Sequence, residues 1–81
     1  MKELDLYKFL QTYSVEMRWD DDELSAWIPG YCLAEFTTLI DNILHEGGLE
    51  ARLTTGGYVW VDLVRICEHF DIDPARIFEG I

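Results

Sequence analysis

The side chains best suited to nucleophilic chemistry are two cysteines and two histidines. Cys67 and His69 stand two positions apart, and residues at that spacing on a helix point to different faces. A reactive thiolate needs a neighbouring base and positive surroundings, whereas Glu68 and Asp71 bring negative charge close to Cys67. We therefore expect no catalytic residue and no enzyme, and predict that Cys32 and Cys67 are buried, unpaired thiols.

Metal and cofactor sites have equally little support in the sequence. A zinc site needs four cysteine or histidine ligands at usable spacings, and those of this chain come singly except for Cys67 and His69. The run Asp20-Asp21-Asp22-Glu23 lacks the alternating ligands and mid-loop glycine of a calcium loop. No glycine-rich phosphate loop is present. We expect no bound metal ion and no cofactor.

The same acidic run is instead a candidate partner-binding surface, formed by Asp20, Asp21, Asp22 and Glu23. The chain has 16 acidic and 6 basic side chains, a net charge of −10 on 81 residues, yet 49% of its residues are hydrophobic. Such a chain should fold and present a negative field that repels nucleic acids. The expected partner is a protein, with a basic nucleic-acid-binding enzyme as the favoured class.

Apolar spacing predicts how these residues are positioned in an α+β fold, a single domain of residues 1–81. Spacings of three and four predict helices at 3–18 and 31–46, a helix at 63–70 and a terminal helical turn at 74–79. Asp21 or Asp22 is expected to cap a short helical turn through 25–27. Asp62 and Asp73 are expected to cap the last two helices, the second with proline at its first position.

Alternation with a period of two predicts a β-hairpin at 49–53/58–62. A two-residue Gly56-Gly57 loop would pair Leu53 with Trp60, whereas a three-residue loop at 55–57 gives one wholly apolar face. We choose the three-residue loop. The predicted partners are Thr54 with Tyr58, Leu53 with Val59, Ala51 with Val61 and Leu49 with Leu63.

The other hairpin face is the second candidate partner-binding surface, formed by Arg52, Tyr58 and Trp60. This register places Arg52 across from Trp60, within reach of a cation–π contact. Two large aromatic residues here are either covered by the first helix or the 19–27 segment, or offered to a partner or a second copy of the chain. The sequence leaves both alternatives open.

Residues 63–78, from Leu63 to Phe78, resemble the last two helices of Cro-type helix-turn-helix repressors. The resemblance implies packing roles for Leu63, Ile66, Phe70, Ile72 and Ile77, and no DNA-contacting residue. In size and acidity the whole chain is similar to small anti-restriction and anti-CRISPR inhibitors of phages and mobile elements. That similarity implies an acidic decoy that occupies a basic groove.

Two binding functions from different classes follow, both in the cytoplasm and neither at a membrane. The first is an acidic inhibitor that imitates nucleic acid toward a nucleic-acid-handling enzyme. The alternative is a regulatory or assembly module that pairs, as a homodimer or with a partner, through the Tyr58/Trp60 face or the hairpin edge. The start of the chain shows no signal-peptide pattern, and no apolar run approaches the ~20 residues of a membrane helix.

Overall fold

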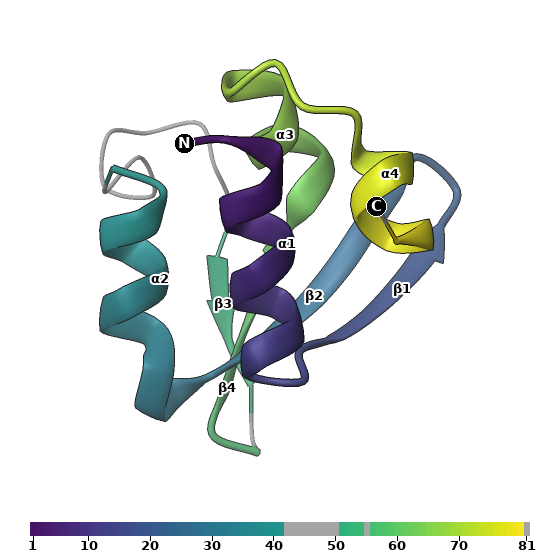
Figure 1. Cartoon of the computed structure of the whole chain (residues 1–81). Helices are drawn as coiled ribbons and strands as arrows, with labels where there is room; N and C mark the ends of the chain where they lie inside the picture. The colour runs from purple at the N-terminus through teal and green to yellow at the C-terminus, as the bar shows by residue number, and fades with distance from the viewer. Residues whose placement is uncertain (42–50, 55, 81) are drawn as a thin grey trace.

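The α+β class is confirmed by a computed structural model, which describes residues 1–41, 51–54 and 56–80. Helices accompany a four-stranded antiparallel sheet (Figure 1). The elements in chain order are α1 (Glu3–Thr12), β1 (Glu16–Asp20), β2 (Glu23–Pro29), the 3-10 turn η1 (Gly30–Cys32), α2 (Leu33–Leu39), β3 (Ala51–Leu53), β4 (Tyr58–Asp62), α3 (Leu63–His69) and α4 (Pro74–Glu79).

The sheet joins two hairpins that are distant in the sequence. Its strand order is β1-β2-β4-β3, so the β1–β2 and β3–β4 hairpins meet along β2 and β4. Ala26 and Val61 lie opposite each other at this seam, and both are fully buried. The outer strands β1 and β3 are edges, and most of their residues are exposed.

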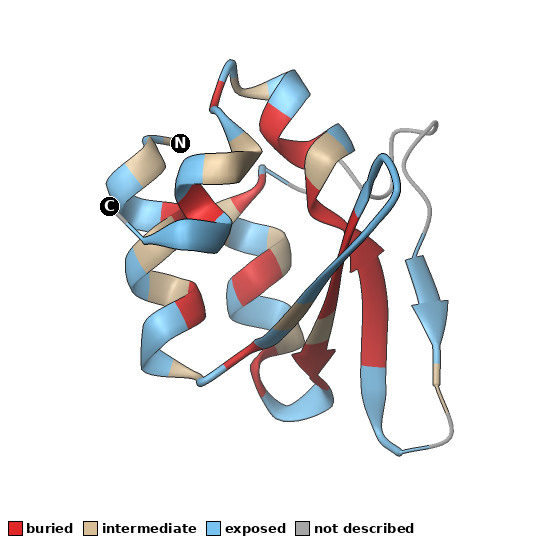
Figure 2. Cartoon of the chain, turned by 90° about the vertical axis from the view of Figure 1, so that its right-hand side faces the viewer, coloured by how far each residue is buried: buried red, intermediate tan, exposed pale blue. Residues whose placement is uncertain are grey.

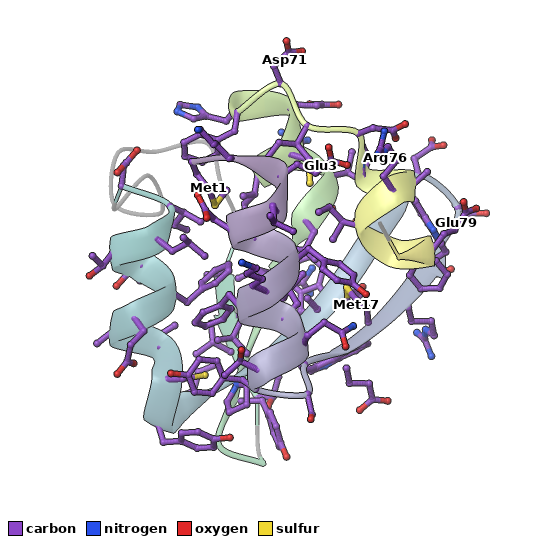
Figure 3. The ribbon with its side chains drawn as sticks, viewed as in Figure 1. Met1, Glu3, Met17, Asp71, Arg76 and Glu79 are labelled. Atoms are coloured by element: carbon purple, nitrogen blue, oxygen red, sulfur yellow. The ribbon has the colours of Figure 1, made fainter. Side chains whose placement is uncertain are left out.

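Helices cover one side of this sheet. In Figures 1 and 2, α1, α2 and α4 lie on the same side of the strands. Alternate residues of β2 point toward them, among them Leu24 and Ile28, and pack with buried residues of the helices. Glu3 of α1 and Arg76 of α4 point toward each other (Figure 3), with 2.8 Å between Oε1 and Nε. Among the described residues, no helix has the length and apolar character needed to span a membrane.

The predicted helix 3–18 is wrong beyond residue 12. Helix α1 ends at Thr12, and Ser14 has a φ of 50°, which is incompatible with a continued helix. Strand β1 then begins at Glu16. Met17 lies within the predicted helix, yet it packs against the core from strand β1. The alternation of apolar and polar residues from 15 to 20 is the strand signal, but Met17 also fits a spacing of four from Tyr13.

The predicted helical turn at 25–27 is also wrong, because these residues belong to β2. Asp21 and Asp22 do not cap a helix and instead form the tight turn between β1 and β2, where Asp20 pairs with Glu23. Asp21 has a φ of 55°, a conformation that aspartate tolerates better than most residues. The acidic run is therefore the turn of a hairpin.

The predicted helix 31–46 is confirmed only over Leu33–Leu39. The 3-10 turn Gly30–Cys32 precedes it, and Ile40 closes it, followed by Asp41 with a φ of 55°. The remaining part of the prediction, after residue 41, lies outside the described residues.

The register of the predicted 49–53/58–62 hairpin is confirmed. Leu53 lies opposite Val59 and Ala51 opposite Val61, and the Thr54 N–H donates to the Tyr58 carbonyl at 2.8 Å. The predicted start of the first strand and the Leu49–Leu63 pair lie outside the described residues.

The last two helices match their predictions within one residue. The predicted helix 63–70 is observed at Leu63–His69, and the predicted turn 74–79 at Pro74–Glu79. The Asp62 and Asp73 carboxylates accept from the N–H groups of Val64 and Ala75, both at 3.0 Å, so both predicted caps are confirmed. Cys32 and Cys67 are buried free thiols, as expected.

Candidate functional site

The side of the sheet turned away from α1, α2 and α4 gathers most of the predicted site residues. We term it the outer face. One row runs across all four strands, from Glu16 through Trp27 and Trp60 to Arg52. Because side chains alternate along a strand, the members of the outer face are Glu16, Arg18, Asp20, Glu23, Ser25, Trp27, Pro29, Arg52, Thr54, Tyr58, Trp60 and Asp62.

Trp60 lies at the centre of this row and is largely buried. The guanidinium carbon of Arg52 lies 4.5 Å from the centroid of its ring, so the predicted cation–π contact is confirmed. Trp27 lies beside it on β2. Only 9% of Trp60 remains exposed. The first helix and the 19–27 segment are the two elements that the sequence suggests as covers for this indole. The 19–27 segment covers it in part, because Trp27 lies beside Trp60 on the neighbouring strand β2.

A second guanidinium stands over the other indole. The guanidinium carbon of Arg18 lies 5.9 Å from the ring centroid of Trp27. Its Nη2 is 3.8 Å from Oδ2 of Asp20, in an exposed ion pair of the kind that contributes little to stability. Two of the six cations of this acidic chain thus lie over the two tryptophans of the outer face.

The acidic turn and the aromatic residues, predicted as two separate surfaces, are continuous. A hollow of about 400 Å³ on the outer face is lined by Asp20 and Glu23 from the turn and by Arg52 and Trp60 from the other hairpin. A neighbouring hollow of about 490 Å³ brings Asp22 to the same indole.

Two predicted site residues lie away from these hollows. Asp21 is exposed at the tip of the turn and lines neither. Tyr58 is 44% exposed at the far end of β4, opposite Pro29, and also lines neither hollow.

Asp62 fixes the outer face to the rest of the fold. The residue is 8% exposed, and its carboxylate accepts from the backbone N–H groups of Val64 at 3.0 Å and Leu24 at 3.4 Å. One side chain therefore caps α3 and holds the start of β2 beside the end of β4. This places the two hairpins, and with them Trp27 and Trp60, at a fixed spacing.

Trp27, Arg18 and Glu16 are members of the outer face that the sequence interpretation missed. The alternation of polar and apolar residues from Glu23 to Ala26 was the available signal. The interpretation of 25–27 as helical concealed it.

Among the described residues, Cys67 is a buried free thiol and His69 has an exposed ring. Burial, and then the negative charges of Asp73 and Asp62, raise the pKa of Cys67 from 9.0 to about 12, so its thiol stays protonated at neutral pH. His69 is exposed and packs edge-on against Phe70, with 4.9 Å between ring centroids. His45 lies outside the described residues. Within the described ranges, no group of three or more His, Cys, Asp or Glu side chains is placed to hold a metal ion.

A third surface hollow lies between α1 and α2, on the opposite side of the molecule. This helix groove, of about 640 Å³, is largely apolar, with Phe9, Tyr13 and Leu39 in its lining together with the charged Lys8 and Glu35. The rings of Phe9 and Tyr13 pack together at 4.7 Å. The groove has fewer charged groups beside its aromatic rings than the outer face, and it provides a control surface for experiments.

No known protein-family model, curated protein or solved structure matches this chain.

Proposed function

We propose that this chain is a non-enzymatic protein that binds a basic surface of a partner protein through its outer face. One observation carries the proposal: carboxylates of the acidic turn and the indoles of Trp27 and Trp60 line a single hollow. Indoles provide affinity when they are desolvated, and carboxylates provide orientation and fast encounter. The combination suits recognition of a folded or extended basic segment.

The charge of the outer face supports a basic partner. Its four carboxylates, Glu16, Asp20, Glu23 and Asp62, outnumber the guanidinium groups of Arg18 and Arg52, which leaves a net charge of −2. The whole chain, at −10, adds a long-range field of the same sign.

A nucleic-acid-handling enzyme is the partner class that fits this field best. Such enzymes neutralise phosphates with clustered lysine and arginine residues, and a rigid array of carboxylates competes for the same groove. Binding of this chain to nucleic acid itself is disfavoured by like charge. The protein would therefore act as an acidic decoy, and its effect on the enzyme would be inhibition.

Photo-crosslinking from two matched positions tests the proposal. Glu16 on the outer face and Glu35 at the helix groove are both exposed glutamates, and each is replaced in turn by p-benzoylphenylalanine. In a lysate of the source cells we expect a crosslinked protein from position 16 that disappears at about 0.5 M salt, because screening weakens the attraction. Crosslinking only from position 35, or capture that salt leaves unchanged, contradicts the proposal.

Self-assembly through the hairpin edge is the second candidate function. Leu53 supports it, because this residue of the edge strand β3 is 83% exposed. An exposed apolar edge strand can pair with a second copy. Size-exclusion chromatography at two concentrations should then show a dimer that Leu53→Lys converts to monomer, and an unchanged monomer at both concentrations rejects this candidate.

A further inference from the structure

Both tryptophans of the outer face already hold a guanidinium group of the chain itself, Arg52 over Trp60 and Arg18 over Trp27. We propose that the outer face recognises arginine side chains of its partner, and that an incoming arginine takes the place of Arg52 on Trp60. This inference rests on the proposed function and specifies the chemistry of the partner. The occupant is an arginine-bearing segment of a basic protein.

The position of Arg52 allows an incoming arginine to displace its side chain from the Trp60 ring. It belongs to β3, an edge strand of three residues that are all exposed. Trp60, by contrast, lies on the inner strand β4 between β2 and β3, and its neighbours on both sides are in fixed register. Movement of the Arg52 side chain would therefore uncover the indole without disturbing the sheet.

The hollow also contains acceptors for an incoming guanidinium. Asp20 and Glu23 line it together with Trp60, from the turn of the other hairpin. A guanidinium stacked on an indole keeps its N–H groups free at the edge of its plane, where a carboxylate can accept two of them. Stacking and paired hydrogen bonds are then satisfied at the same time.

This geometry distinguishes arginine from lysine. An ammonium group is a compact, strongly hydrated charge, and it has no plane with which to stack. Both cations feel the same negative field, so the field alone gives no preference between them. A preference for arginine at equal charge is the signature of the stacked arrangement.

Two peptides of equal charge provide the test, fluorescently labelled hexa-arginine and hexa-lysine, with affinities measured by anisotropy. We expect hexa-arginine to bind roughly five- to tenfold more tightly, since tenfold corresponds to about one cation–π contact. Trp60→Leu, with its fold checked by circular dichroism, should bind both peptides alike. Equal affinities for the unaltered protein, or a preference for arginine that survives Trp60→Leu, overturn the inference.

The displacement itself is tested by Arg52→Gln against Lys8→Gln. Both residues are exposed and both substitutions remove one positive charge, but Lys8 lies at the helix groove on the other side. If Arg52 competes with the incoming arginine, Arg52→Gln should raise the affinity for hexa-arginine several-fold more than Lys8→Gln does. An equal increase reflects charge alone and overturns the displacement, as does a loss of affinity.

The peptide-binding experiments and the crosslinking experiment test different claims and can fail independently. Capture of a partner from position 16 without any preference for hexa-arginine would reject the arginine inference and leave the proposed function in place. Capture only from position 35 would reject the proposed function, whatever the peptides show.

Discussion

Trp27 and Trp60 lie directly opposite each other on β2 and β4, in the register that joins the two hairpins. The two residues are far apart in the sequence. They are paired because Ala26 and Val61, on the other side of the same strands, are buried together in the core. The packing of the core thus fixes the spacing of the two indoles on the outer face.

Removal of the Arg52 guanidinium should expose Trp60. In a background with Trp19→Phe and Trp27→Phe, we expect Arg52→Ala to increase quenching of Trp60 fluorescence by acrylamide, because the ring loses its cover at 4.5 Å. The free energy of unfolding should fall by about 0.5–1 kcal/mol, the usual size of an exposed cation–π contact. Unchanged quenching would mean that Arg52 does not shield the ring in solution.

Asp62 and Asp73 both cap helices, but their removal should have unequal costs. Asp73→Ala removes one exposed acceptor and should cost about 1 kcal/mol in urea unfolding. Asp62→Ala removes a buried acceptor shared by Val64 and Leu24, and the cost should approach about 2 kcal/mol or exceed it. Equal losses would show that the contact with Leu24 contributes nothing.

A side chain at position 30 should destabilise the fold. A Cβ there would lie 2.9 Å from the carbonyl oxygen of Gly57, which already accepts from the Gly30 N–H at 2.9 Å. We expect Gly30→Ala to destabilise the fold by about 1–3 kcal/mol, since backbone must move to accommodate it. Gly56→Ala is the control, because its Cβ would meet only the side chain of Tyr58 at 3.3 Å. Thermal unfolding that ranks Gly56→Ala as the more harmful contradicts this packing.

Cys67 should make the fold sensitive to alkaline pH. Its pKa is raised in the folded state, so its contribution to stability is fully present below pH 9, the ordinary pKa, and is lost as the pH rises toward about 12. Over this range the unfolded chain releases a proton that the folded chain retains. The free energy of unfolding therefore falls by up to about 1.4 kcal/mol per pH unit. Urea titrations should show this slope reduced in Cys67→Ala. An identical slope in both proteins would exclude Cys67 as its cause.

The local part of this fold could be predicted from the sequence, and the long-range part could not. The hairpin register followed from the apolar face shared by Val59 and Val61, and both final caps followed from aspartates before apolar helices. The first hairpin was missed because Met17 satisfies helical and strand spacing alike. The φ angle is positive at Ser14, between α1 and β1, and at Asp21 in the hairpin turn, and neither position has the glycine that usually marks such a conformation.

The candidate site was predicted in fragments for the same reason. Arg52 and Trp60 belong to a local hairpin, so their contact could be derived from the register. The pairing of β2 with β4 brings Asp20, Glu23 and Trp27 to them, and no short-range pattern encodes it. Only the assembled sheet joins the acidic turn to the aromatic residues.

The claim that a partner binds the outer face can be tested directly with the three tryptophans. Trp27 and Trp60 lie on that face, whereas Trp19 lies on the helix side of the sheet, against Phe78 at 5.9 Å. In a ¹⁵N-labelled sample titrated with the protein captured from position 16, the indole N–H signals of Trp27 and Trp60 should move and that of Trp19 should stay. A bound partner that moves only Trp19, or none of the three, would contradict the account.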